Sequence, residues 1–230
     1  MGCLSIKNRL ANTVIFDFDG TLALLNIDFN RMRRDIGALI TSHGIDYSCL
    51  NQSYVLELIG EAGKIIGQRS DDEEKVFRNE AYRIIEEIEV AAAKMGKLFE
   101  TTKHLLATLE KATVRTGIIT RNCRKAVRTV FPDIASYCRV VITREDVHKV
   151  KPHPEQIQLA LDRLGATAEF SVMVGDHPLD IETGRRGGTL TAGVLTGYFQ
   201  EADFARAHAN VVLTQAADLL AYLAPSPFPD

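Results

Sequence analysis

The chain has 230 residues, of which 46% are hydrophobic and 25% charged, and its formal net charge is −3. These values are ordinary for a globular protein and argue against extensive disorder. The lack of a basic excess argues against nucleic-acid binding, and no apolar run approaches the roughly 18 residues that a membrane span needs. We therefore expect a soluble cytoplasmic protein that binds neither nucleic acid nor a membrane.

The four cysteines, Cys3, Cys49, Cys123 and Cys138, are scattered and form no C-x-x-C pair. This spacing predicts reduced thiols, as in the cytoplasm, rather than a disulfide framework or a structural zinc site. The histidines show no ligand spacing of the H-E-x-x-H kind either.

The first element in chain order is a short apolar run at residues 14–16, followed by a long stretch, 24–100, without a convincing strand. That stretch has three helical stripes of apolar residues, at 29–40, 55–66 and 76–88, and an acidic turn at 71–74 precedes the third. We interpret 24–100 as an all-helical domain inserted into a core made of residues 1–23 and 101–230.

Further apolar runs of strand length follow at 117–119, 140–142, 172–174 and 190–194, with a weaker one at 211–213. Runs of this kind are typical of parallel strands buried on both faces. Helical patterns lie between them, and one of these ends at Gly165. The alternation predicts an α/β fold with a doubly wound parallel sheet, and residues from Ala224 onward are expected to form a loose tail.

Polar residues follow four of the apolar runs. The first run precedes Asp17-Phe18-Asp19-Gly20-Thr21, and the others precede Thr120-Arg121-Asn122, Lys151-Pro152-His153-Pro154-Glu155 and Gly175-Asp176, with Asp180 four residues on. Ligands of open parallel sheets bind beyond the carboxyl ends of the strands, so these groups should meet in one crevice. Crowded carboxylates without histidine or cysteine favour Mg²⁺, and Mg²⁺ beside a lysine suits a phosphate.

These four motifs, in this order, resemble those of the haloacid dehalogenase superfamily of phosphotransferases. Asp17-x-Asp19-Gly20-Thr21 matches the first motif, Thr120 the second, Lys151 in K-P-x-P-E the third, and Gly175-Asp176-x-x-x-Asp180 the fourth. The helical insert also falls where the phosphoglycolate phosphatase and β-phosphoglucomutase branch has an α-helical cap. The resemblance implies a Rossmann-like core and a Mg²⁺-dependent phosphatase that acts on a small phosphorylated metabolite.

The resemblance also implies roles for individual residues. Asp17 is expected to be the nucleophile and, with the Asp19 carbonyl and Asp176, a Mg²⁺ ligand, while the Asp19 side chain acts as general acid and base. Thr120 and Lys151 would contact the phosphoryl group. The expected supporting residues are Asp180, Gly20, Thr21, Arg121, Asn122 and Gly175.

Several of these positions have a plain structural interpretation as well. Thr120 could cap the helix that follows it, Asp180 could lie in the first turn of a helix that begins at Pro178, and Lys149 competes with Lys151. His177 could be a structural residue or could support the site.

Arg31 and Arg34, in the first helix of the insert, are candidates for contacting the rest of the substrate, although a solvated helix face is the simpler explanation of each. Residues 22–28 depart from the Leu-x-Asp-Ser that commonly follows the first motif in relatives, so the substrate is left open.

Other functions remain open. A phosphomutase of the β-phosphoglucomutase type would use the same residues and return the phosphoryl group to a sugar. A dehalogenase needs no acid at Asp19, so that residue argues against one. A protein that keeps the fold and binds without turnover is the alternative outside enzymology.

Overall fold

The computed structural model describes residues 2–225. The chain divides into two compact units, Met1–Leu25 with Gly96–Asp230, which we call the core unit, and Asn26–Met95, which we call the helical insert. Among the described residues, no helix has both the length and the apolar character needed to cross a membrane.

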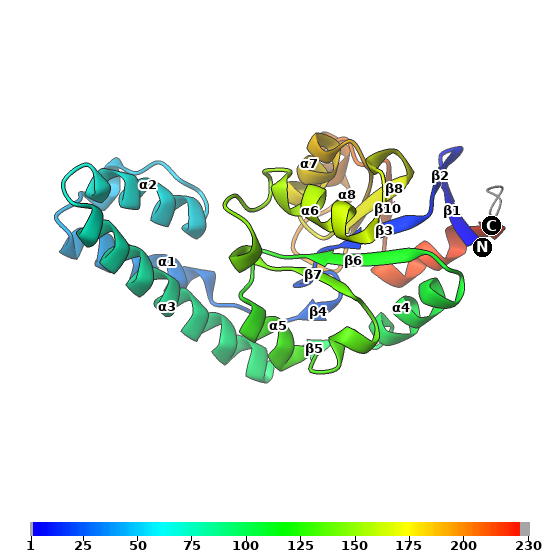
Figure 1. The fold of residues 1–230 in the computed structure, drawn as a ribbon, viewed down its shortest axis with the longest axis horizontal. Helices are drawn as coiled ribbons and strands as arrows, with labels where there is room; N and C mark the ends of the chain where they lie inside the picture. The colour runs from blue at the N-terminus through cyan, green and yellow to red at the C-terminus, as the bar shows by residue number, and fades with distance from the viewer. Residues whose placement is uncertain (1, 226–230) are drawn as a thin grey trace. The chain divides into compact units, whose positions relative to one another are not determined.

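The centre of the core unit is a six-stranded parallel sheet with the order β10-β9-β8-β3-β6-β7 (Figure 1). Its strands are β3 (Thr13–Phe16), β6 (Arg115–Ile119), β7 (Val140–Ile142), β8 (Ser171–Gly175), β9 (Leu190–Val194) and β10 (Val211–Leu213). Every residue of β3, β8 and β9 is buried, as expected for strands covered on both faces. The sequence prediction of a doubly wound parallel sheet is confirmed.

Helices connect these strands and cover the two faces of the sheet. They are α4 (Thr102–Lys111), α5 (Arg124–Val130), α6 (Glu155–Leu164), α7 (Pro178–Gly187) and α8 (Glu201–Arg206). The apolar stripe of α6 packs with β6 and β7 in one cluster that includes Ile119, Ile142 and Ile157. Figure 1 shows α6 and α7 on one face of the sheet and α4 on the other. Gly165, which was expected to stop α6, has a φ of 59°.

Short 3₁₀ helices also belong to this unit. They are η2 (Ile134–Ser136), η3 (Arg144–Asp146), η4 (Ala168–Phe170) and the longer η5 (Ala216–Tyr222).

The helical insert consists of three α-helices and one short turn of 3₁₀ helix, as its three apolar stripes predict. They are α1 (Phe29–Ser42), η1 (Tyr47–Cys49), α2 (Val55–Gly67) and α3 (Asp71–Met95). Ile36, Ile59 and Phe77 represent the buried stripes of the three helices. Asp28 caps α1 by accepting a hydrogen bond from the N–H of Arg31 at 2.8 Å.

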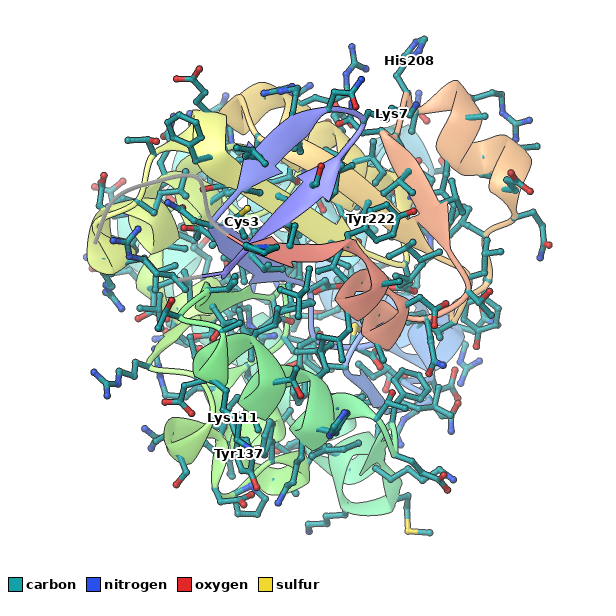
Figure 2. The ribbon with its side chains drawn as sticks, turned by 90° about the vertical axis from the view of Figure 1, so that its right-hand side faces the viewer. Cys3, Lys7, Lys111, Tyr137, His208 and Tyr222 are labelled. Carbon is teal, nitrogen blue, oxygen red and sulfur yellow. The ribbon has the colours of Figure 1, made fainter. Side chains whose placement is uncertain are left out.

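Two small sheets of the core unit have no clear sequence signal. The first joins β4 (Ala23–Leu24), which precedes the insert in the chain, to β5 (Lys97–Leu98), which follows it. The second is a small antiparallel sheet of β11 (Leu223–Pro225), β1 (Gly2–Ile6) and β2 (Arg9–Ala11), which Figure 2 shows with Lys7 in the turn between β1 and β2. Ala224 and Pro225, expected in a loose tail, therefore pair with β1, and residues 226–230 lie outside the described part of the chain.

Candidate active site

The register of the sheet brings the first, second and fourth motifs to one edge. Phe16 of β3 lies opposite Ile118 of β6 on one side and Val174 of β8 on the other. Asp17, Thr120 and Asp176 follow these three positions by one or two residues. The N–H of Asp17 also donates to the carbonyl of Val174 at 2.8 Å. The strand order therefore brings together motifs that are far apart in the sequence.

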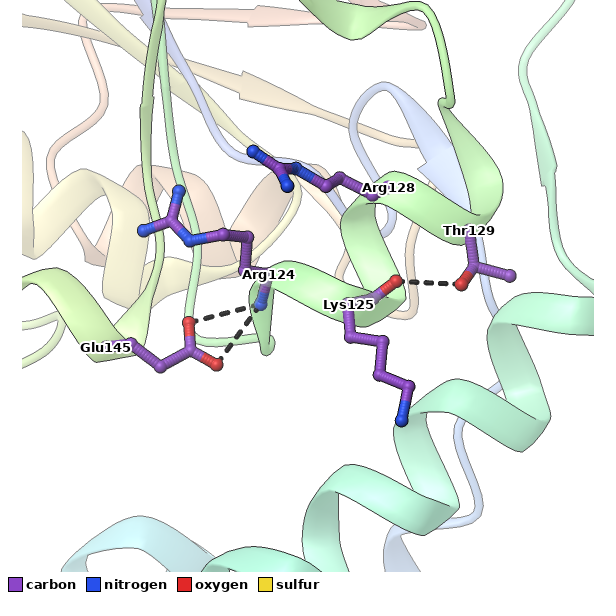
Figure 3. Close-up of a pocket in the computed structure, with 5 residues that line it drawn as sticks. All are labelled: Arg124, Lys125, Arg128, Thr129 and Glu145. Carbon is purple, nitrogen blue, oxygen red and sulfur yellow. Dashed lines mark hydrogen bonds between the residues drawn. The ribbon is translucent and has the colours of Figure 1, made fainter.

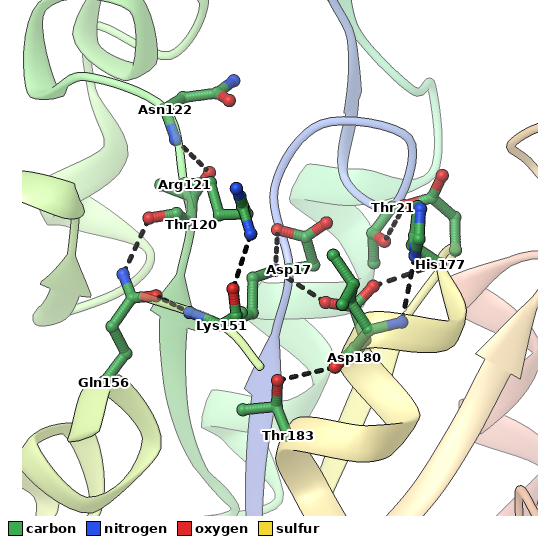
Figure 4. Close-up of polar contacts among 12 residues, drawn as sticks. Asp17, Thr21, Thr120, Arg121, Asn122, Lys151, Gln156, His177, Asp180 and Thr183 are labelled. Atoms are coloured by element: carbon green, nitrogen blue, oxygen red, sulfur yellow. Dashed lines mark hydrogen bonds and ion pairs between the residues drawn. The ribbon is translucent and has the colours of Figure 1, made fainter. Parts of the chain in front are cut away.

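A buried lysine connects the first, third and fourth motifs (Figure 4). Lys151 Nζ lies 2.6 Å from Asp17 Oδ1 and 2.6 Å from Asp180 Oδ1. The side chains of Lys151, Asp17 and Asp180 are only 3%, 11% and 1% exposed. Charges withdrawn from water in this way persist only when they are paired. Lys149, its competitor in the sequence, is exposed.

Asp17, Asp176 and Asp180 form an acidic cluster, in which one oxygen from each carboxylate lies within 4.8 Å of the others. Burial raises the pKa of Asp17 to about 6, although the charge of Lys151 acts in the opposite direction. Burial, followed by the charges of Asp17 and Asp180, raises the pKa of Asp176 to about 8. When ionised, three carboxylates and one ammonium leave an excess of two negative charges.

This donor set fits a divalent cation of the Mg²⁺ kind. Mg²⁺ is bound through carboxylate, carbonyl and water oxygens, and its charge would offset the excess negative charge of the cluster. The side chains of the cluster offer oxygen atoms alone, without a soft sulfur or imidazole ligand.

Asp19, the expected acid and base, is close enough to the cluster for its charge to contribute to the raised pKa of Asp176. Asp19 Oδ1 accepts a hydrogen bond from the N–H of Leu25 at 2.9 Å. Thr21 donates its hydroxyl to Asp176 Oδ1 at 3.3 Å, which ties the first motif to the fourth. Gly20 has a φ of 84°, in the left-handed region that favours glycine, and its N–H donates to the carbonyl of Ala23 at 2.7 Å.

Thr120 is 1% exposed, and its Oγ1 accepts the N–H of Asn122 at 3.1 Å. That bond leaves the hydroxyl proton of Thr120 free to donate to a ligand. Thr120 does not cap α5, because the N-cap position belongs to Cys123. Asn122 is 8% exposed, and its Nδ2 has no hydrogen-bond partner within the described residues.

Gln156, which belongs to none of the four motifs, connects the second and third of them. Its Nε2 donates to the carbonyl of Thr120 at 2.8 Å, and its Oε1 accepts the N–H of Lys151 at 3.0 Å. It is fully buried in the first turn of α6. A glutamine beside the apolar Ile157, directly after K-P-x-P-E, was the available signal. Arg121 extends towards the same loop and donates to the Lys151 carbonyl at 2.6 Å.

His177 caps α7. Its ring Nδ1 accepts the backbone N–H of Leu179 at 2.9 Å, and its backbone N–H donates to Asp180 Oδ2 at 3.1 Å. Burial, together with the charge of Lys151, lowers its pKa to about 4, so the ring is neutral near pH 7. Asp180 thus has both of the roles considered from the sequence, in the first turn of α7 and beside Lys151. A side chain at Gly175 would overlap Asp180, with a Cβ 2.2 Å from its carboxyl carbon.

The two arginines proposed for substrate selection differ in their surroundings within the helical insert. Arg31 Nε lies 3.3 Å from Asp35 Oδ2, and both side chains are exposed. Arg34 instead lines a pocket of about 380 Å³ together with Asn30, Arg33 and Tyr47.

A second pocket, of about 530 Å³, lies beside α5 in the core unit (Figure 3). It is lined by Arg124, Lys125, Arg128, Thr129 and Glu145, none of which belongs to the acidic cluster. The Glu145 carboxylate accepts the N–H of Arg124 at 3.1 and 3.2 Å.

Comparison with known proteins matches this arrangement to a family. A sequence model of the haloacid dehalogenase-like hydrolases matches residues 14–194. The pyrophosphatase PpaX of Anoxybacillus flavithermus is 32% identical over 217 residues, which cover 92% of this chain and 96% of that protein.

Solved structures agree with the sequence comparison. A haloacid dehalogenase-like protein from Bacteroides fragilis matches with a TM-score of 0.63 and 28% identity, over 91% of this chain and 99% of that one. A hydrolase of the same family from Deinococcus radiodurans, solved with bound phosphate and sodium, matches with a TM-score of 0.59 and 20% identity, over 92% and 94%. The resemblance inferred from the motifs is confirmed: the chain belongs to the haloacid dehalogenase-like hydrolase family.

Proposed function

We propose that this hydrolase is a Mg²⁺-dependent phosphatase that cleaves a small phosphorylated metabolite through an aspartyl-phosphate on Asp17. The observation that supports this most strongly is the position of Asp17. Its carboxylate follows a central strand, lies 2.6 Å from Lys151 Nζ and belongs to the acidic cluster. In this proposal, one site contains the nucleophile, a cation held by ion pairs, and oxygen ligands for a metal ion.

The first half-reaction transfers the phosphoryl group to the protein. A carboxylate oxygen of Asp17 forms a bond to phosphorus, and the bond between phosphorus and the ester oxygen breaks. Asp19 gives its proton to the departing oxygen, so an alcohol leaves. In the second half-reaction the Asp19 carboxylate takes a proton from water, the water oxygen bonds to phosphorus, and inorganic phosphate departs from Asp17.

The surrounding residues hold and neutralise the transferred group. In this proposal Lys151 offsets charge on Asp17 and on the phosphoryl oxygens, and Asp180 holds that lysine in place. Thr120 donates its free hydroxyl proton to a phosphoryl oxygen. A Mg²⁺ ion, held by Asp17, Asp176 and the Asp19 carbonyl, would supply charge neutralisation at the phosphoryl group. Arg121 stabilises the loop that contains Lys151.

Asn122 supports the inference that the site receives a ligand with acceptor oxygens. A buried amide N–H without an acceptor costs about 1–3 kcal/mol in free energy. We propose that Asn122 Nδ2 donates to an oxygen of the bound substrate, which removes that cost when the substrate binds.

The helical insert, in the same proposal, is a cap that selects the substrate and excludes water during transfer. Its first helix supplies the candidate residues Arg31 and Arg34. The four cysteines form no disulfide with one another, in keeping with the cytoplasmic location that we propose.

Hydrolysis of an aryl phosphate, with and without Mg²⁺, tests the proposal. Metal-dependent release of phosphate, absent from Asp17→Asn and slowed about 10²-fold or more in Asp19→Ala, is the expected result. A panel of phosphorylated metabolites then identifies the substrate class, and it includes pyrophosphate because the relative from Anoxybacillus flavithermus is named a pyrophosphatase. Turnover that persists in Asp17→Asn would contradict the proposal.

A phosphomutase is the second candidate, because it would use the same residues. Incubation with a sugar phosphate and its bisphosphate distinguishes the two, since a mutase yields the isomeric sugar phosphate whereas a phosphatase yields free phosphate. A folded protein that binds Mg²⁺ and turns over none of these compounds would favour a binding role.

A further inference from the structure

The loop after β9, residues 195–199, lies at the same edge of the sheet as the acidic cluster. β9 pairs in parallel with β8, and Gly193 lies opposite Gly175, the residue before Asp176. The loop leaves β9 with the N–H of Leu195 donating to the carbonyl of Leu213 at 3.0 Å. Its sequence, Leu-Thr-Gly-Tyr-Phe, belongs to none of the four motifs.

Three residues of this loop contact the first and fourth motifs. The hydroxyl of Thr196 donates to the carbonyl of Gly20. The ring of Phe199 packs edge-on against His177, with 4.3 Å between the ring centroids. Between them, Gly197 lies so close to Asp176 that a Cβ at position 197 would be 2.0 Å from Oδ2.

A second glycine approaches the same carboxylate. A Cβ at Gly20 would lie 2.2 Å from Asp176 Oδ2. The other oxygen, Oδ1, accepts the hydroxyl of Thr21. The position of the Asp176 carboxylate is therefore restricted by a hydroxyl donor on one oxygen and by two glycine backbones near the other. Real Cβ atoms do not come within 3.0 Å of such an oxygen, so a side chain at 197 requires the carboxylate to move.

We propose that Gly197 is a positioning residue, which fixes the Asp176 carboxylate and thereby sets the affinity and ion selectivity of the divalent-cation site. The inference rests on the proposed function, in which Asp176 is a metal ligand. Mg²⁺ demands nearly ideal octahedral geometry at about 2.0–2.1 Å, whereas Ca²⁺ accepts six to eight oxygens in flexible arrangements at about 2.3–2.6 Å. A displaced carboxylate should therefore weaken Mg²⁺ binding more than Ca²⁺ binding.

Calorimetric titration of the full chain with MgCl₂ and, separately, with CaCl₂ tests this for wild type and Gly197→Ala. We expect Gly197→Ala to raise the Mg²⁺ dissociation constant about 10- to 100-fold, the range found when groups that orient metal ligands are altered. The Ca²⁺ dissociation constant should rise less, so the ratio of the two constants shifts towards Ca²⁺. The thermal unfolding midpoint of Gly197→Ala in EDTA should stay close to that of wild type, because the carboxylate end of the Asp176 side chain can move to make room.

Matched controls come from the same loop and from the insert. Tyr198 is 87% exposed, and a Cβ at Gly60 meets nothing within 4 Å, so Tyr198→Ala and Gly60→Ala should keep both dissociation constants.

Thr196→Val, which removes only the bond to Gly20, should weaken Mg²⁺ binding in the same direction as Gly197→Ala.

Three outcomes would overturn the inference: an unchanged Mg²⁺ constant in Gly197→Ala, equal weakening of both ions, or the same weakening in Tyr198→Ala. Failure of the proposed function has a different signature, because wild type itself would then show no saturable Mg²⁺ binding.

Discussion

Replacement of Lys151 by methionine should destabilise the protein in a way that depends on pH. The substitution keeps a similar volume but removes the cation that lies 2.6 Å from both Asp17 Oδ1 and Asp180 Oδ1. Two unit charges about 4 Å apart attract by about 4 kcal/mol at an effective dielectric constant near 20. Removal of one partner from a buried pair costs about 3–5 kcal/mol in unfolding free energy.

The sign of the pH dependence follows from Asp17. Its pKa is already raised to about 6, and Lys151 is the largest influence that lowers it, so the variant's Asp17 has a still higher pKa. A carboxyl with a raised pKa contributes stability at low pH, and that contribution is lost as the pH rises through its folded value. The deficit of Lys151→Met should therefore increase above about pH 6.

Thermal unfolding at pH 5 and pH 8 measures this deficit. For a chain of this size, 1 kcal/mol shifts the midpoint by about 2–4 °C, so 3–5 kcal/mol corresponds to about 6–20 °C at pH 8. Lys149→Met is the matched control, because Lys149 lies in the same loop and is exposed. A variant as stable as this control at pH 8, or one with equal deficits at the two pH values, would refute the reasoning.

Three further predictions concern the same site. Burial raises the pKa of Asp17 from 3.8 to about 6 and that of Asp176 from 3.8 to about 8, so the contribution of both carboxyls to folding stability is lost as the pH rises. Mg²⁺ should therefore raise the thermal unfolding midpoint more at pH 8 than at pH 5, and an equal rise at both pH values would contradict this. Gln156→Met leaves the Thr120 carbonyl and the Lys151 N–H without their hydrogen-bond partner, and should lower the unfolding free energy by about 1–3 kcal/mol per group. The kcat for aryl phosphate should fall as well, and an unchanged kcat would show that Gln156 does not position the site. Asn122→Ala removes the donor proposed for an oxygen of the bound substrate and should lower kcat/KM for the best metabolite, and an unchanged kcat/KM would exclude that contact.

The fold was largely predictable because its signals are local. The strands at 14–16, 117–119 and 172–174 are continuous apolar runs, and the stripes of the insert have helical periodicity. The short pairing of β4 with β5 and the sheet of β1, β2 and β11 were not predicted. The β4–β5 and β1–β11 pairings join segments that are far apart in the chain, whereas β1 and β2 form a local hairpin. All of these strands are too short for periodicity to identify.

The site was predictable to the extent that its residues stand directly after strands. Asp17, Thr120 and Asp176 do so, and the parallel register brings them together. Gln156 and Gly197 had no comparable signal. Gln156 acts through its contacts with two backbone groups, and Gly197 matters through the space that its missing side chain leaves for Asp176. Both depend on tertiary proximity rather than on the pattern of the chain.

The most direct test of the central claim is to identify the residue that carries phosphate during turnover. Wild type and Asp17→Asn would be mixed with an aryl phosphate and Mg²⁺, quenched in acid within one turnover, digested and analysed by mass spectrometry. We expect a phosphorylated peptide in wild type, with the modification on Asp17, and none in Asp17→Asn. Phosphate on another residue, or turnover by wild type with no phosphorylated peptide at any quench time, would contradict the assignment of Asp17 as the nucleophile.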